Sequence, residues 1–275
     1  MRIGIDLGGT NIRGGHVDSD WNISAYKRET FRNLGTLEET LDQLITFISP
    51  LRHRAVTGIG IGVPSIVDLA KGIVYNVTNI PSWQKVPLRD ILEQALGLPV
   101  AINNDVNCFI LGEHRHGLVQ GLKNVVGVSC GTGLGSGIII NGELFSGTNC
   151  GAGEVGLLHY LDRNMEYYAS GNLFKVKYNT SAAQAHSAGL HGDPLALKAW
   201  AEFGQHLAEA IKSVVYAYDP EAIVLGGSLS KAYLLFEGAM HEALKNFTFP
   251  ESIRKLKIYQ TVDENVTLLG AAALV

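Results

Sequence analysis

The sequence has few of the features that mark secreted or membrane-bound proteins. Its three cysteines, Cys108, Cys130 and Cys150, are odd in number and widely spaced, which predicts free thiols in a reducing cytoplasm and not a disulfide framework. No apolar run approaches the roughly 20 residues that cross a bilayer. The N-terminus also lacks the charged segment and apolar stretch of a secretion signal. We therefore expect a cytoplasmic protein with no membrane partner.

The chain also lacks the charge pattern of a nucleic-acid-binding protein. It carries 22 basic and 26 acidic residues in 275, a net charge of −4, and no basic cluster is visible. A basic face is the electrostatic footprint that nucleic acid requires, so we expect no nucleic-acid partner. The length allows one large domain or two of ordinary size.

A glycine-rich pattern occurs twice in the chain. The first copy is IGIDLGGTNIR (Ile3–Arg13) and the second is VVGVSCGTGLGSGIII (Val125–Ile140). Each begins as a strand, passes through a glycine turn and continues as a strand. Glycines let the backbone approach phosphate oxygens, and Thr10 and Thr132 add hydroxyl donors. Two such turns, from two halves of the chain, predict an ATP-using enzyme.

Other phosphate-binding motifs fit less well. The P-loop string G-x-x-x-x-G-K-[ST] does not occur. Gly131, Gly133 and either Gly135 or Gly137 approach a dinucleotide-binding fingerprint, but that motif opens a helix, whereas Asn141-Gly142 after an isoleucine run predicts a hairpin. The first turn taken alone is equally well read as a plain hairpin. The second copy, and an aspartate just ahead of the first, favour phosphate binding.

The remaining sequence alternates strands and helices, which predicts the α/β class. The predicted strands are 3–7, 12–17, 56–63, 100–102, 125–130, the runs before and after Asn141-Gly142, and 222–227. The predicted helices are 36–49 (with Thr36 and Glu39 as a capping box), 87–96, 106–113, 194–218 and 268–275. We expect a polar loop up to about residue 85, an irregular stretch over about 146–170, and a hinge near Gly117–Lys123.

Asp105 follows a short apolar strand, beside two asparagines. Ligands of open α/β sheets bind beyond the carboxyl ends of the strands. A carboxylate there suits a general base that accepts a hydroxyl proton, while Asn104 hydrogen-bonds a neighbouring hydroxyl. The alternative is that Asn-Asp only caps the next helix.

Eight segments resemble, in order, those of the ROK family (repressors, unclassified reading frames and sugar kinases). They are DLGGTNIR, VPSIVD, NIPSW, NNDVNC, GTGLGSGIIING, GAGEVG, YASGNLF and LGGSLS. The resemblance covers essentially the whole chain. It implies an actin-like, hexokinase-like (ribonuclease H-like) duplicated fold, with two α/β domains around a central cleft. We place these at 1–117 and 118–265, with the C-terminal helix of about 266–275 packing back onto the first.

The resemblance also implies site residues. Asp105 matches the catalytic base, and Asp6 the carboxylate that helps to hold Mg²⁺, generally through water. Sugar-contacting positions are Asn104, Glu154, Glu166, Ser65, Thr78 and Asn79. ATP-binding positions are Gly8, Gly9, Thr10, Asn11, Gly131, Thr132, Gly133, Gly226, Gly227 and Ser228. The expected partners are a sugar and ATP with Mg²⁺, and the expected assembly is a homodimer.

One segment departs from the family pattern. The histidine that usually follows the first glutamate by three residues is Leu157, and no cysteine lies between Glu154 and Glu166. The usual zinc-binding cysteine loop is therefore missing, and His159 alone cannot make a site of about four ligands. We expect no zinc. We interpret Glu113-His114-Arg115-His116 as a solvated helix end and not a metal site.

These observations predict an ATP-dependent sugar kinase that phosphorylates a hexose or hexose derivative, at the 6-hydroxyl. One alternative is a sugar-sensing regulator; the family's repressors carry an N-terminal helix-turn-helix, which this sequence does not show, so we expect no DNA binding. The other is a non-catalytic sugar-binding protein of the same family.

Overall fold

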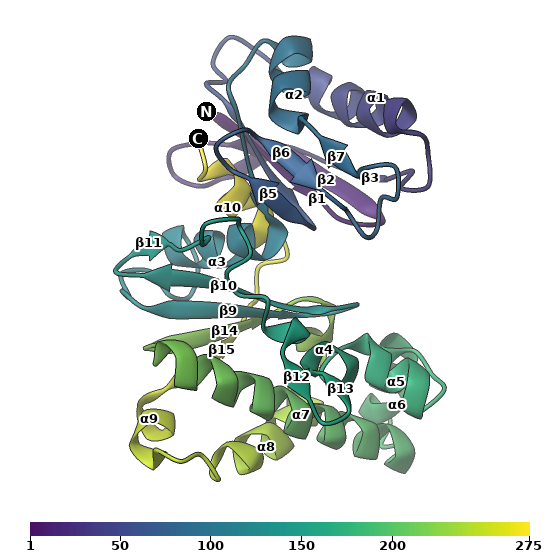
Figure 1. The fold of residues 1–275 in the computed structure, drawn as a ribbon, viewed down its shortest axis with the longest axis vertical. Helices are drawn as coiled ribbons and strands as arrows, with labels where there is room; N and C mark the ends of the chain where they lie inside the picture. The colour runs from purple at the N-terminus through teal and green to yellow at the C-terminus, as the bar shows by residue number, and fades with distance from the viewer. The chain divides into compact units, whose positions relative to one another are not determined.

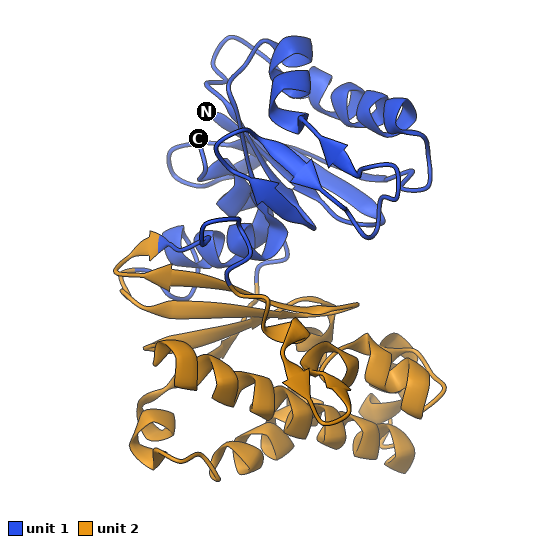
Figure 2. Cartoon of the chain, viewed as in Figure 1, with its two compact units in different colours: residues 1–120, 144–152, 263–275 blue, residues 121–143, 153–262 orange.

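Two five-stranded sheets with the same strand plan form the framework of the protein. The computed structural model describes residues 1–275. It divides into a first unit (1–120, 144–152 and 263–275) and a second unit (121–143 and 153–262) (Figure 2). The strand orders are β3-β2-β1-β4-β8 and β11-β10-β9-β14-β15. Each sheet thus joins an N-terminal hairpin to two later parallel strands, which confirms the predicted α/β class and its duplication.

The first unit's sheet aligns the carboxyl ends of three parallel strands. Its strands are β1 (Arg2–Leu7), β2 (Asn11–Val17), β3 (Ile23–Thr30), β4 (Ile59–Val63) and β8 (Val100–Asn104). β1 and β2 pair antiparallel around the first glycine turn, as predicted. In the parallel pairs, Asp6 lies beside Gly62 and Val63 beside Asn104. The expected site residues therefore follow the strands at one edge of this sheet.

Four helices complete the first unit (Figure 1): α1 (Leu37–Ile48), α2 (Leu88–Leu96), α3 (Asp105–Arg115) and α10 (Val266–Ala272). The capping box of Thr36 and Glu39 is present at the start of α1, as predicted. α10 packs against α3, β1 and β4. The close contact between α10 and β4 requires a glycine at position 60, because a Cβ on Gly60 would lie 1.7 Å from the carbonyl oxygen of Ala271.

The prediction of a polar loop up to about residue 85 is wrong. This segment contains β5 (Ile66–Asp68) and β6 (Ile73–Tyr75), which pair with each other, and β6 also pairs with β7 (Lys85–Val86). Val67, Val74 and Val86 are buried in the core of this unit. Strands of two or three residues are too short to show the alternation that would identify them in a sequence.

The second unit repeats the plan with more helices. Its strands are β9 (Val125–Cys130), β10 (Leu134–Ile140), β11 (Glu143–Leu144), β14 (Ala222–Gly226) and β15 (Lys257–Gln260). Its helices include α5 (Gly171–Lys177), α6 (Ala182–Leu190), α7 (Pro194–Tyr218), α8 (Tyr233–Leu244) and α9 (Pro250–Lys255). α7 has the predicted bounds and packs against α8. None of the helices is long and apolar enough to span a membrane.

The stretch 146–170, predicted to be irregular, contains some regular secondary structure. It contains a two-stranded hairpin of β12 (His159–Tyr160) and β13 (Arg163–Asn164), followed directly by the short helix α4 (Met165–Tyr168). The side chain of Asn164 caps α4 by accepting a hydrogen bond from Tyr167 N. This hairpin fills the interval between the two expected sugar-contacting glutamates.

Candidate functional site

The first unit brings two carboxylates near one buried thiol. Burial raises the pKa of the Cys108 thiol well above its ordinary value, and the charges of Asp105 and Asp6 raise it further. Cys108 lies on α3, one turn after Asp105. Asp6 pairs with Gly62 across the sheet, and a Cβ on Gly62 would lie 3.4 Å from the Cα of Asp105, so the two carboxylates predicted from separate motifs lie in one region of this unit.

Asp6 is buried and paired with Arg13, its neighbour across the β1–β2 hairpin. Arg13 Nε donates to Asp6 Oδ2 at 3.0 Å, and Arg13 Nη2 donates to the same oxygen. Burial raises the pKa of Asp6 despite the opposing effect of the arginine. Arg13 was not among the residues predicted from the sequence, although the hairpin register places it opposite Asp6.

Asn104 and Asp105 occupy the start of α3. Asn104 Oδ1 accepts from the backbone N–H groups of Val106 and Asn107 at 2.8 and 3.2 Å, so the capping interpretation is confirmed for this residue. Its Nδ2 donates to Ser65 O at 3.3 Å. Asp105 is half-buried, and its Oδ1 accepts from Val106 N at 3.0 Å. At Asn104 a cap and a ligand contact are compatible, because Oδ1 makes the capping bonds and the Nδ2 amide carries a second N–H beside the one donated to Ser65 O.

The first glycine turn lies against a loop of its own unit. Gly8 N donates to Asn11 O at 2.9 Å to close the turn, and Thr10 at its tip is exposed. A Cβ on Gly9 would lie 2.7 Å from the Cβ of Asn79. Asn79 therefore lies beside the first glycine turn, and both Asn79 and its neighbour Thr78 are exposed.

Ser65 lies between two elements of the first unit. Its hydroxyl donates to Tyr75 O on β6, and its carbonyl oxygen accepts the bond from Asn104 described above. The structure thus joins two of the predicted sugar-contacting residues, Ser65 and Asn104, by a direct hydrogen bond.

A buried polar network behind the start of α3 was not predicted. Asn107 Nδ2 donates to Asn103 Oδ1 at 2.9 Å, and the thiol of Cys150 donates to the same oxygen at 3.2 Å. Asn103 Nδ2 donates to Ser146 Oγ at 3.4 Å. The network fastens the segment 144–152 to the helix that begins with Asp105. Only the repeated asparagines in NNDVNC hinted at it.

In the second unit, two predicted nucleotide-binding turns lie together. The turn from Gly131 to Gly133 is closed by Gly131 N donating to Gly133 O at 2.9 Å, and Thr132 is exposed at its tip. A Cβ on Gly131 would lie 3.3 Å from Ser228 Oγ. Gly227, which follows β14, has φ +82 and no room for a side chain, since a Cβ would lie 2.2 Å from Cys130 O. The β9 and β14 ends therefore form one glycine-lined surface.

The backbone directly before Glu154 is hydrogen-bonded to β10. Ser136 N and Ser136 Oγ both donate to Gly153 O, at 2.8 and 2.7 Å, which ties the preceding residue to β10. Glu154 is exposed as a residue, but its carboxyl is partly desolvated. That desolvation and then the charge of Glu166 raise its pKa. The two glutamates, predicted from different motifs, are thus close enough to interact.

Glu166 lies against the second glycine turn. Its Oε2 accepts from Leu134 N at 3.0 Å, and a Cβ on Gly133 would lie 2.6 Å from the same oxygen. Glu166 was predicted from the family resemblance to contact the sugar alone. The structure adds a contact with the second glycine turn, which separate motifs could not reveal because the two partners are 32 residues apart in the sequence.

The helix end at Glu113 differs from its predicted solvated state. Glu113 is buried, with 1% of its surface exposed, and its Oε2 accepts from Leu118 N at 2.9 Å. It closes the turn after α3, while Arg115 and His116 are exposed. The chain holds no cluster of three or more His, Cys, Asp or Glu side chains that could bind a metal ion.

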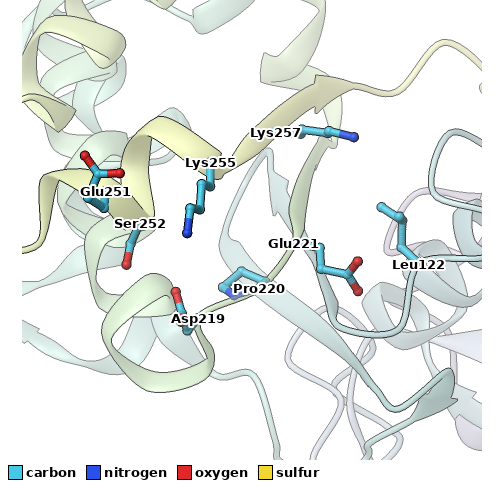
Figure 3. Close-up of a pocket in the computed structure, with 8 residues that line it drawn as sticks. All are labelled: Leu122, Asp219, Pro220, Glu221, Glu251, Ser252, Lys255 and Lys257. Carbon is cyan, nitrogen blue, oxygen red and sulfur yellow. The ribbon is translucent and has the colours of Figure 1, made fainter.

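A surface pocket lies at the opposite edge of the second sheet. Its lining is Leu122, Asp219, Pro220, Glu221, Glu251, Ser252, Lys255 and Lys257 (Figure 3). Glu221 immediately precedes β14 and Lys257 begins β15, so the pocket adjoins the amino ends of these strands. Gly226, Gly227 and Ser228 lie at the carboxyl end of β14. The pocket is therefore distinct from the glycine-lined surface.

Comparisons with known proteins find relatives along the whole chain. The glucokinase of Thermotoga maritima is 28% identical, over 99% of this chain and 96% of that protein. The N-acetyl-D-glucosamine kinase of Vibrio cholerae is 30% identical, over 86% and 87%. The crystal structure of a ROK family glucokinase from Streptomyces griseus, in complex with glucose and AMPPNP, aligns with a TM-score of 0.87 and 27% identity, over 100% of this chain and 98% of that one. Residues 2–275 match the sequence model of the ROK family. The chain therefore belongs to the ROK family and has its actin-like, hexokinase-like fold.

Proposed function

We propose that the protein is an ATP-dependent sugar kinase that transfers the γ-phosphoryl group to the 6-hydroxyl of a hexose or hexose derivative. The observation that carries the proposal is the location of Asp105. Asp105 is a half-buried carboxylate at the carboxyl end of a parallel strand. It lies in the same region as Asp6 and directly after Asn104, a predicted sugar-contacting residue. The names of the relatives, glucokinase and N-acetyl-D-glucosamine kinase, support the same reaction class.

In this mechanism Asp105 would accept the hydroxyl proton as the sugar oxygen attacks the γ-phosphorus, and the bond between that phosphorus and the oxygen bridging to the β-phosphate would break, so that ADP leaves. Catalysis of this reaction is mainly positioning and electrostatic stabilisation. The backbone N–H groups of the two glycine turns would bind phosphate oxygens, and the exposed Thr10 and Thr132 would add hydroxyl donors. Asn104 Nδ2, Glu154 and Glu166 would hold the sugar hydroxyls, with Ser65, Thr78 and Asn79 as further contacts.

The residues present fit a magnesium ion carried in with the nucleotide. Protein-bound Mg²⁺ is commonly held by one or two carboxylates together with substrate phosphates. Asp6 Oδ2 accepts both bonds from Arg13, and Oδ1 accepts none, so one carboxylate oxygen is available to a hydrated ion. When bound, the ion would neutralise charge on the phosphates. We further propose that the enzyme needs no zinc and acts as a homodimer.

A coupled ADP-release assay tests the proposal, with hexoses, amino sugars and their acetylated forms as acceptors. We expect sugar-dependent ADP release that requires Mg²⁺. Sugar binding without ADP release, for every acceptor, would instead support the non-catalytic sugar-binding protein. NMR analysis of the product identifies the hydroxyl that is phosphorylated.

A further inference from the structure

Two tyrosines of the helix that carries Glu166, Tyr167 and Tyr168, form an aromatic cluster with Tyr160 and His206 from outside the helix. The ring of Tyr168 on α4 lies 5.5 Å from that of Tyr160 on β12, at a right angle, and 5.0 Å from that of His206 on α7. The ring of Tyr167 lies 5.0 Å from that of Tyr168. Aromatic pairs at these separations and angles attract each other beyond their shared burial. α4, a helix of only four residues, is thus held from outside.

Hydrogen bonds connect this cluster to the long helix α7. Tyr160 Oη lies 3.1 Å from His206 Nδ1, and His206 Nε2 lies 3.4 Å from Glu202 Oε1. Burial lowers the pKa of His206 more than Glu202 raises it, so the ring is neutral at pH 7. Because a carboxylate can only accept, the proton lies on Nε2, and Tyr160 donates to Nδ1. The chain of bonds runs Tyr160 to His206 to Glu202.

Glu202, at the end of this series of hydrogen bonds, is held by two further side chains. Tyr178 Oη donates to Glu202 Oε2 at 2.7 Å, and Lys177 Nζ binds Glu202 Oε1 at 2.5 Å. On the near side, Tyr168 donates its hydroxyl to Asp162, which lies in the β12–β13 turn, and that bond raises the pKa of Tyr168 to about 12. The hairpin and α4 are therefore fastened together and, through Tyr160, to α7.

The position of α4 decides where the carboxylate of Glu166 lies. Its Oε2 bond to Leu134 N is the contact through which α4 reaches the turn Gly131–Gly133. When a substrate-positioning group is displaced by about 1 Å, the rate of the catalysed reaction can fall on the order of a hundredfold. We propose that Tyr160 and His206 are positioning residues that orient Glu166 and, through it, the second glycine turn. The role of Glu166 toward the sugar rests on the proposed function; its bond to the turn does not.

The test compares two tyrosine-to-phenylalanine variants of the full chain. Tyr160→Phe keeps the ring and removes the hydroxyl that meets His206. Tyr216→Phe is the matched control, because Tyr216 lies on α7 and its hydroxyl meets Thr248 at 2.6 Å, in a different cluster with Phe247. Each variant loses one hydroxyl hydrogen bond, so a general loss of stability would affect both alike.

Amide hydrogen exchange provides a readout that needs no kinase activity. We expect Tyr160→Phe to speed exchange at Leu134 about three- to tenfold, the scale of one lost hydrogen bond, and Tyr216→Phe to leave it unchanged. Equal exchange in Tyr160→Phe and the parent would overturn the proposal, whether or not the parent phosphorylates any sugar. If the two variants exchange as expected but the parent releases no ADP with any sugar, the result would count against the proposed function alone.

A double-mutant cycle provides the kinetic readout. We expect Tyr160→Phe to raise the sugar KM about three- to tenfold in the parent, but less than about twofold when Glu166 is already Gln, because residues acting through one another are not additive. Tyr168→Ala should raise the sugar KM further and weaken sugar use more than ATP use. An equal effect of Tyr160→Phe in both backgrounds would show that Tyr160 does not act through Glu166.

Discussion

Replacing Asp105 by asparagine tests the assignment of the catalytic base. The isosteric amide keeps an oxygen to accept the 3.0 Å bond from Val106 N, so α3 should start at the same residue. Losing one negative charge from the first turn of a helix costs about 0.3–1 kcal/mol of stability. Removing a positioned base, by contrast, lowers the rate about 10²–10⁴-fold. The variant should therefore fold and bind sugar within about tenfold of the parent while nearly losing phosphoryl transfer.

The assay combines ADP release with sugar binding by calorimetry and thermal unfolding. Asp90→Asn is the matched control, since Asp90 also lies in the first turn of a helix of the same unit, α2, but is exposed and outside the site. It should lose a similar small amount of stability and no activity. Turnover of Asp105→Asn within a few-fold of the parent would remove Asp105 from the role of base.

Three further predictions follow from the second unit. Glu166→Gln should raise the sugar KM at least about tenfold and leave the ATP KM near that of the parent, whereas Glu166→Ala, which cannot accept from the turn, should raise both; equal ATP KM values in the two variants would contradict this. Gly227→Ala should lower the free energy of unfolding by at least about 2 kcal/mol, through backbone strain and overlap with a carbonyl oxygen, while Gly121→Ala, with φ +76 and open space, should suffer strain alone; similar melting temperatures would refute the overlap. The sugar KM should rise as the pH falls, beginning above the ordinary glutamate pKa of 4.5, because the pKa of Glu154 is raised; Glu154→Gln should abolish that pH dependence.

Sequence patterns located the elements whose signals are local. The capping box at Thr36 and Glu39 marked the start of α1, and apolar spacing gave both ends of α7. The glycine turns identified the two hairpins, because strand, turn and strand follow one another directly in the chain. Such features depend on neighbouring residues, so they can be predicted without knowing the rest of the structure. The strands β5 to β7 could not, because each is short and is ordered by its partners.

The same division holds for the site. Residue types at fixed spacing were enough to predict the duplicated strand–turn–strand plan, the carboxylate after β8 and the positions of the glycines. Arg13 and Asp6 are only 7 residues apart and face each other across a hairpin, but the packed structure was needed to show that Glu166 binds the turn at Leu134 and that Tyr160 meets His206. Glu166 and Leu134 are 32 residues apart, and Tyr160 and His206 are 46 apart. Contacts of that separation depend on how helices and sheets pack, which periodicity and motif spacing do not encode.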